Sequence, residues 1–220
     1  MKKNQLRVVA LCVPMILIAL ASFKPFATSR PWKDTPQKIP GRIENEFYDV
    51  GGEGVAYRDT DSVNNGSGKL NPANGTYLNE FRMKEGVDIS YTKTNLVDDH
   101  PYNKVKPVMD QLYVGWTTPG EWINYTVDVA EPGKYTFGIQ YTSHDEGGIS
   151  FLLDGKKITG TIRIPTTYDS RDTVAWRQWH HWNYLDHAAE LNLPKGRHVL
   201  TLKTEVSGNM NYDFMTLTRK

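Results

Sequence analysis

Apolar and polar residues alternate with period two in one segment after another beyond residue 39, and this alternation narrows the possible folds. The clearest case has buried-type residues Ile123, Tyr125, Val127 and Val129 at every second position of residues 122–129. Successive side chains of a strand point to opposite faces, so this pattern predicts a strand with one buried face. Similar short segments, separated by Gly, Pro and Asp turns, lie at residues 135–141, 149–153, 158–164, 199–203 and 212–218. Closely spaced strands without a long helical period predict an all-β sandwich of two antiparallel sheets.

The N-terminus has the pattern of a secretory signal peptide. Three basic residues, Lys2, Lys3 and Arg7, precede an apolar run over residues 8–21 that ends Ala-Leu-Ala. This run is short for a bilayer-spanning helix, and its small-x-small ending is typical of a cleavage site. We therefore expect a signal peptide over residues 1–21, with a retained membrane anchor as the alternative. Cleavage removes the only cysteine, so the mature protein would be a thiol-free bacterial protein, secreted or in the cell envelope (periplasm or cell surface), with no membrane segment.

Composition limits the partners and the domain count. The chain has 220 residues, with 26 Lys and Arg against 25 Asp and Glu, a formal net charge of +1. Nucleic-acid binding needs clustered basic residues, so this balance argues against it. Residues 22–38 contain three prolines and no clear period, which predicts a linker in which Trp32 is incidental. Residues 39–220 then form one module with long loops around residues 58–79 and 92–111, and we expect a monomer.

Two groups of side chains could carry function. Glu44 and Glu46 are two residues apart, so a strand would place both carboxylates on one face, where a hard cation such as Ca²⁺ relieves their repulsion. A solvated edge strand is the alternative. Tryptophans are the second group, because those that reach the surface can stack on sugar rings while the others are core: Trp116, Trp122, Trp176, Trp179 and Trp182.

The segment around Trp176–Trp182 is interpreted as a strand because of its clustered aromatic residues. Its adjacent histidines, His180 and His181, would then point to opposite faces. Neither these nor the other histidines show metal-ligand spacing.

Five motifs, in this order, resemble those of the family 6 carbohydrate-binding modules, and the resemblance covers about residues 39–220. They are Ile43-Glu44-Asn45-Glu46, Glu85-Gly86-Val87-Asp88-Ile89, the stretch Val114-Gly115-Trp116 to Gly120-Glu121-Trp122-Ile123-Asn124-Tyr125, Trp176-Arg177-Gln178-Trp179, and Asn211-Tyr212-Asp213-Phe214. Each motif is loose, whereas their common order is specific. The resemblance implies a jelly-roll β-sandwich, which agrees with the strand pattern.

The resemblance also implies site residues. A sugar ring would lie between Trp116 and Trp176 in loops at one end of the sandwich, with Asn211 hydrogen-bonded to the sugar and Trp179 in the core. Trp122 matches a position that lines a second site on the concave face in some members, and the loop at residues 92–111 could cover that face. The family's structural Ca²⁺ matches Glu44, Glu46 and Asp213, joined by a backbone carbonyl near Arg82.

The resemblance therefore implies a stand-alone, non-catalytic module that binds a β-linked polysaccharide, with a separate glycoside hydrolase as a further partner. A jelly-roll glycoside hydrolase or lyase is one alternative, for which Asp110 and Glu121 are spare acids near the aromatic loop. A structural or adhesion protein of the envelope is the other. Loss of glycan binding on Trp176→Ala separates the module from the adhesion protein, and a hydrolysis assay separates it from the enzyme.

Overall fold

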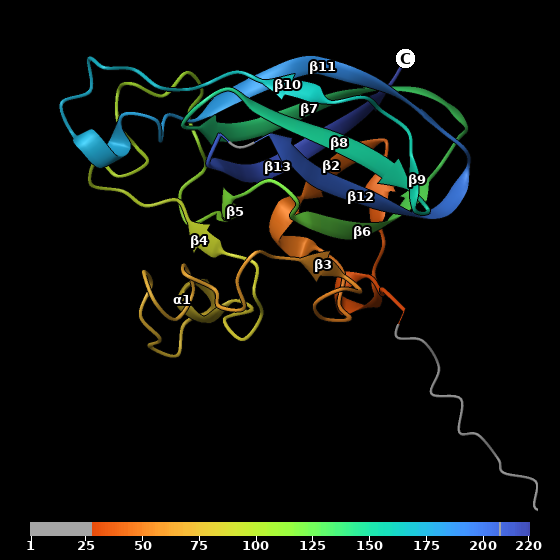
Figure 1. Cartoon of the computed structure of the whole chain (residues 1–220), viewed down its shortest axis with the longest axis horizontal. Coiled ribbons are helices and arrows are strands. Elements are labelled where there is room, and N and C mark those ends of the chain that lie inside the picture. The colour runs from red at the N-terminus through yellow and green to blue at the C-terminus, as the bar shows by residue number, and fades with distance from the viewer. Residues whose placement is uncertain (1–27, 207) are drawn as a thin grey trace, which may run out of the picture.

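The computed structural model describes residues 28–206 and 208–220, which form a jelly-roll β-sandwich (Figure 1). The predicted signal peptide lies outside the described residues. None of the described helices has the length and apolarity needed to cross a bilayer. The elements, with η for 3₁₀ helices, are η1 (Trp32–Asp34), β1 (Gln37–Ile39), β2 (Gly41–Glu44), η2 (Asn45–Phe47), β3 (Tyr57–Arg58), α1 (Tyr77–Glu80), β4 (Ile89–Tyr91), β5 (Leu112–Thr117), β6 (Trp122–Val129), β7 (Gly133–Ser143), β8 (Gly147–Leu153), β9 (Lys156–Lys157), β10 (Ile162–Ile164), η3 (Ala175–Arg177), β11 (Asn183–Leu193), β12 (Gly196–Val206) and β13 (Met210–Arg219).

The strands form two sheets. One has the order β1-β6-β12-β8-β10, with β3 on β6 and β9 on β8, and the other has the order β11-β7-β13-β5-β4, with β2 on β13. The described pairs are antiparallel apart from β1 with β6, which run parallel. The predicted all-β sandwich is confirmed. The strands expected from the period-two pattern are present, although only Ile162–Ile164 of the segment 158–164 forms a strand.

The core lies between the sheets and is rich in aromatic side chains. In β6 the alternating residues Ile123, Tyr125, Val127 and Val129 are all buried, which is the face that the sequence predicted. Phe137 of β7 and Phe151 of β8 meet across the sandwich edge to face, with ring centroids 4.9 Å apart. Each such buried side chain contributes about 1.5–3 kcal/mol to folding, which is how a chain with no cysteine in this region stays stable.

The folded module begins earlier than the sequence indicated. Gln37 and Lys38, expected in the linker, are strand residues of β1 and pair with β6. Trp32, expected to be incidental, packs edge to face on Phe81 with centroids 5.3 Å apart. No period in the sequence indicates this strand, because β1 has only three residues.

The segment before β11 is not a strand, contrary to the interpretation of its aromatic residues. It contains η3 and a turn, and the strand begins only at Asn183. Aromatic residues are frequent in strands because they pack well on half-buried surfaces, and here the same packing occurs between loops. His180 and His181 nevertheless point in different directions, since His180 contacts Asp98 and His181 contacts Asp172.

Two long loops lie together at one end of the sandwich, on the left in Figure 1. They are residues 92–111 and residues 165–182. The backbone N–H groups of Lys104 and Val105 both donate to the carbonyl of Trp182, at 2.8 and 3.1 Å. The Tyr102 hydroxyl donates to the carbonyl of Arg171, 2.8 Å away. The two loops therefore form one structure rather than two independent flaps.

Candidate functional site

Asn211, at the start of β13, organises the loop end of the sandwich. Its side chain is 1% exposed, and its Oδ1 accepts a 2.9 Å hydrogen bond from the backbone N–H of Trp116. Because that N–H can only donate, the orientation of the amide is fixed. Its Nδ2 then donates to Thr142 Oγ1 at 2.9 Å and to Nδ1 of His180 at 3.0 Å. The amide thus holds β5 on one side and the long loop of His180 on the other.

This network continues from His180 to Asp98. Since His180 Nδ1 accepts from Asn211, Nε2 carries the proton and donates to Asp98 Oδ1 at 2.6 Å. The same oxygen accepts from Trp182 Nε1 at 2.7 Å, and Asp98 Oδ2 accepts from the backbone of Lys93 at 2.7 Å. Burial alone would raise the pKa of Asp98, but the donors around it, led by His180, hold that pKa below its usual value. We call Asn211, His180, Asp98 and Trp182 the Asn211 network.

Trp116 has a strained backbone that the network holds in place. Its φ is +48°, a left-handed conformation that costs a bulky residue about 1–3 kcal/mol. The side chain of Asn211 approaches β5 closely enough that a Cβ at Gly115 would lie 3.0 Å from Asn211 Oδ1. A larger residue at position 115 would therefore require Asn211 to move by a few tenths of an ångström. Trp116 itself is half-buried.

The structure brings Trp179, rather than Trp176, to the Asn211 network. The Trp179 ring lies edge to face on His180, with centroids 5.6 Å apart, and 5.9 Å from the ring of His144. It is half-buried and is not part of the hydrophobic core, contrary to the expectation that it is a core residue. Trp176 lies on η3 and is 56% exposed. The two tryptophans are three residues apart in a loose motif, so sequence alone could not tell which one faces Asn211.

The side chain of Asn211 is buried, whereas the resemblance implied that it would be hydrogen-bonded to the sugar. Its donors and its acceptor are engaged within the protein, and its side chain is buried under the loops. In the structure it positions Trp116 and His180 instead of presenting an amide to solvent. His180, His144 and Asp98 were missed as site residues. His180 directly follows the tryptophan motif, which could have pointed to it, whereas no sequence signal marks His144 or Asp98.

Trp122 lies on an open groove of the other sheet. The groove has a volume of about 200 Å³ and is lined by Trp122, Asn124, Leu152, Thr201 and Lys203, which come from β6, β8 and β12. No residue of the loop at 92–111 lines this groove, so that loop does not cover it in the part of the chain that the structure describes. The face that Trp122 was expected to line is therefore accessible.

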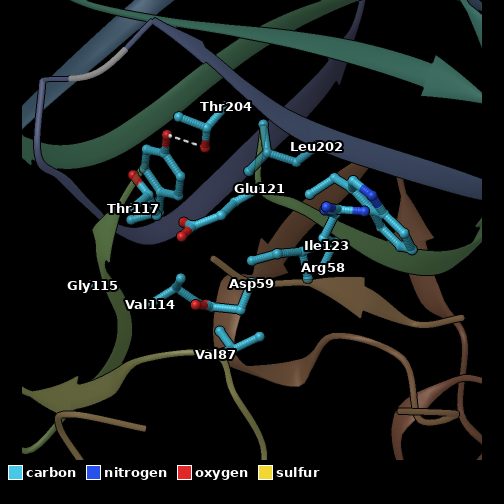
Figure 2. A pocket seen from close by; sticks show the side chains of 12 residues that line it. Arg58, Asp59, Val87, Val114, Gly115, Thr117, Glu121, Ile123, Leu202 and Thr204 are labelled. Atoms are coloured by element: carbon cyan, nitrogen blue, oxygen red, sulfur yellow. Dashed lines mark hydrogen bonds between the residues drawn. The ribbon is translucent and has the colours of Figure 1, made fainter. Parts of the chain in front are cut away.

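A small cavity between the sheets cannot hold a sugar. Figure 2 shows it, with Asp59, Glu121, Thr204 and Val87 among the residues that line it. Its volume of about 10 Å³ is no more than one water molecule needs. Burial, reinforced by the charge of nearby Glu121, raises the pKa of Asp59 to about 7. This small cavity has no room for a substrate beside Asp59, although Asp59 also lines an open pocket of about 570 Å³ with Glu53 and Asp61.

Glu121, a spare acid in the sequence, is fixed by hydrogen bonds. Its Oε1 accepts from the backbone N–H of Thr60 at 3.2 Å and from its hydroxyl at 2.7 Å. The backbone N–H and the hydroxyl of Thr118 donate to the carboxylate as well, both at 2.7 Å. A carboxylate with these donors holds two loops together, and it is not free to act as a general acid or base.

Two buried carboxylates, one from η2 and one from β13, each have an oxygen without a hydrogen-bond partner among the described residues. Glu46 is 2% exposed and Asp213 is 1% exposed, and neither Glu46 Oε2 nor Asp213 Oδ1 has a hydrogen-bond partner among the described residues. Burial raises the pKa of Glu46 well above its usual range and that of Asp213 to about 7. Buried ionisable oxygens without partners are costly, so these two atoms fit a bound cation.

Glu44 and Arg82, the other expected members of the metal site, are engaged elsewhere. The sequence predicted that Glu44 and Glu46 share one face of a strand. This is wrong, because β2 ends at Glu44 and Glu46 lies in η2. The Glu44 carboxylate forms a two-pronged ion pair with Arg42, at 2.7 and 2.8 Å. The Arg82 guanidinium donates to the carbonyls of Tyr48 and Asp49, while its own carbonyl accepts from the Glu85 N–H. Arg82 therefore braces the loop after η2.

Comparison with solved structures gives sandwiches of related shape. A family 6 module of Cellvibrio mixtus lichenase 5A, in complex with cellotriose, is 17% identical, with 82% of this chain and 98% of that chain covered and a TM-score of 0.47. A module of Clostridium stercorarium, in complex with cellobiose, is 12% identical, with 84% and 98% covered and a TM-score of 0.49. A family 43 arabinoxylan arabinofuranohydrolase of Bacillus subtilis, in complex with cellotetraose, is 18% identical with a TM-score of 0.48. The match covers 84% of this chain and 28% of that enzyme.

Sequence comparison assigns the family. Comparison with curated proteins gave no match. The profile described as Carbohydrate binding module (family 6) matches residues 88–219, from the edge of β4 to the end of β13. This match covers more than half of the chain and includes Trp116, Trp179 and Asn211. The chain therefore belongs to the family 6 carbohydrate-binding modules.

Proposed function

We propose that this protein is a non-catalytic module that binds a β-linked polysaccharide at the loop end of the sandwich. The observation that carries the proposal is the Asn211 network, which fixes Trp116 on one side and the Trp179 loop on the other. Two half-buried indole rings held by a rigid base suit the C–H faces of a sugar ring, because little conformational freedom is lost on binding. The anchored carboxylate of Glu121 gives the hydrolase alternative no support.

Affinity electrophoresis tests this proposal. The purified protein is run through gels that contain single plant or algal polysaccharides, beside gels without polysaccharide. We expect retardation by at least one β-linked glycan and no release of reducing ends from it. Migration unchanged by the whole panel would contradict sugar binding, and steady release of reducing ends would favour a hydrolase.

Trp122→Ala tests the groove on the other sheet. If this variant reduces the retardation, but by less than Trp179→Ala at the loop end does, the groove is a second, weaker binding face.

We also propose that Glu46 and Asp213 hold a structural Ca²⁺. Two buried carboxylate oxygens lack partners among the described residues, and Ca²⁺ binds such oxygens in irregular geometry. Glu44 is the third acid near this pair, and its charge raises the pKa of both Glu46 and Asp213. An ion here would join η2 to β13 and so connect the first and last parts of the module. When bound, it would neutralise the buried carboxylates.

Calcium removal should lower the thermal stability. At 100 times its dissociation constant a bound ion contributes about 2.7 kcal/mol, so we expect chelation to lower Tm by about 5–10 °C. Asp213→Asn should abolish the response to Ca²⁺, whereas Asp128→Asn, at an exposed surface ion pair, should keep it. Differential scanning calorimetry with and without Ca²⁺ measures the shift. A Tm that is independent of Ca²⁺, together with a more stable Asp213→Asn variant, would contradict the proposal.

We further propose that the protein is exported from a bacterium and acts as a monomer beside a separate glycoside hydrolase. The basic and apolar N-terminal segment supports export. A binding module raises the effective concentration of an enzyme at its substrate, which is the reason to expect such a partner.

A further inference from the structure

The two long loops at the loop end carry a second cluster of polar side chains, apart from the Asn211 network. It consists of His100 from the first loop and Asp172 and His181 from the second. One ligating atom from each of the three residues lies within 4.8 Å of the others. All three are buried, with exposed fractions of 4% for His100, 0% for Asp172 and 1% for His181.

One ring nitrogen of His100, Nδ1, is buried without a hydrogen-bond partner among the described residues. Its Nε2 lies 3.1 Å from the carbonyl oxygen of His180, which can only accept, so Nε2 carries the proton. Nδ1 therefore has a free lone pair. It is buried and has no hydrogen-bond partner in the described ranges 28–206 and 208–220. A buried acceptor without a partner costs about 1–3 kcal/mol, so this atom needs an explanation.

His181 presents a second lone pair by the same reasoning. Its Nδ1 lies 3.0 Å from the carbonyl oxygen of Thr167, so Nδ1 carries the proton. In the neutral ring, Nε2 then directs a lone pair at Asp172 Oδ2, 3.1 Å away. Two lone pairs in such contact repel each other unless a positive charge lies between them. A proton on Nε2 would satisfy His181, but it would leave His100 Nδ1 without a partner.

Asp172 is held in its ionised form and in a fixed orientation. Arg177 donates from Nε to Oδ2 at 2.6 Å and from Nη2 to Oδ1 at 2.9 Å, and the backbone N–H of Val174 also donates to Oδ1. The Arg177 hydrogen bonds hold the pKa of this carboxyl well below its usual value. A carboxylate oxygen has more than one acceptor position, so Oδ2 can bind Arg177 and a cation together.

We propose that His100 Nδ1, His181 Nε2 and Asp172 Oδ2 form a binding site for a divalent transition-metal ion of the zinc class. Two imidazole nitrogens and one carboxylate oxygen suit Zn²⁺, whereas Ca²⁺ selects oxygen ligands. Each histidine donates its other ring N–H to a backbone carbonyl, the arrangement that orients metal-binding histidines in proteins. A water molecule would complete the usual four ligands.

The ion would join the two loops that support the proposed sugar site. His100 also lines an open cavity of about 410 Å³ together with Pro101 and Lys104, so one of the three ligands lies beside space that solvent can enter. His181 is adjacent to His180 of the Asn211 network, so fixing His181 also fixes the imidazole that donates to Asp98. The site is separate from Glu46 and Asp213, whose ligands are all oxygens, and it does not depend on the proposed sugar binding.

Zinc titration of the full protein tests this proposal. The protein is freed of metal with a chelator, saturated with Ca²⁺ to fill oxygen-ligand sites, and titrated with Zn²⁺ by calorimetry. We expect one ion per chain and a Tm rise of about 5–10 °C at 100 times the dissociation constant. His100→Gln should weaken binding by about 100-fold or more. His187→Gln is the matched control, since His187 is exposed on β11, and it should bind as the unaltered protein does.

Cobalt provides a readout that needs no variant. Co²⁺ in place of Zn²⁺ should give the strong visible absorption of a four-coordinate site, and Zn²⁺ should displace it. Equal, weak zinc binding by the unaltered protein and His100→Gln would overturn the proposal. So would the absence of that cobalt absorption, or ring-nitrogen NMR that shows His181 protonated on both nitrogens and unchanged by Zn²⁺.

Discussion

Trp179→Ala should reduce the affinity for the bound glycan by about 30-fold. A stacked indole removes enough apolar surface from water to contribute about 2 kcal/mol, and 1.4 kcal/mol corresponds to a factor of ten in affinity. Trp179 packs on His180 of the Asn211 network, whereas Trp176 is 56% exposed on η3. Trp176→Ala should therefore change the affinity by less than about threefold. Calorimetric titration with the glycan found by electrophoresis measures both.

The pair of variants decides between the two tryptophans. Trp179→Phe keeps a ring on His180 and should recover most of the lost affinity, which separates stacking from a folding defect. Tm should be measured for each variant, because Trp179 also contacts His144. If Trp176→Ala abolishes binding while Trp179→Ala does not, the sugar lies on the outer surface of η3, as the sequence motif first indicated.

Asp98→Ala should destabilise the protein by about 3–5 kcal/mol, the usual cost of removing one partner of a buried charged network. Asp98 is 1% exposed and accepts hydrogen bonds from His180, Trp182 and the backbone of Lys93. Its removal leaves three buried donors without an acceptor. Thermal unfolding followed by circular dichroism should show Tm lower by about 6–20 °C.

Asp99→Ala is the matched control, because Asp99 is the exposed neighbour and accepts only from the backbone N–H of Leu96 among the described donors. It should cost less than about 1 kcal/mol. Asp98→Ala should also weaken glycan binding, since it frees His180 and, through it, Asn211. Equal stabilities of the two variants would mean that the loops fold independently of this network.

The limits of sequence reasoning are clearest within single segments. The alternation in β6 predicted both its strand and its buried face, because a strand has a fixed period and one face must be buried. The same reasoning failed at Trp176–Trp182, where aromatic residues pack between loops that have no period. It also missed β1, whose three residues pair with β6 only because the chain returns there.

Sequence reasoning was sufficient for the all-β class, for strands with a clear period such as β6, and for the family motifs, since these depend on local periodicity and residue type. The three-dimensional structure was needed to show that Trp179 faces the Asn211 network, that Asn211 is buried, and that His100 meets His181. His100 and His181 lie in different loops, and their lone pairs converge only after those loops have packed. Contacts between distant loops depend on how the loops fold onto each other, and no local pattern in the sequence records that.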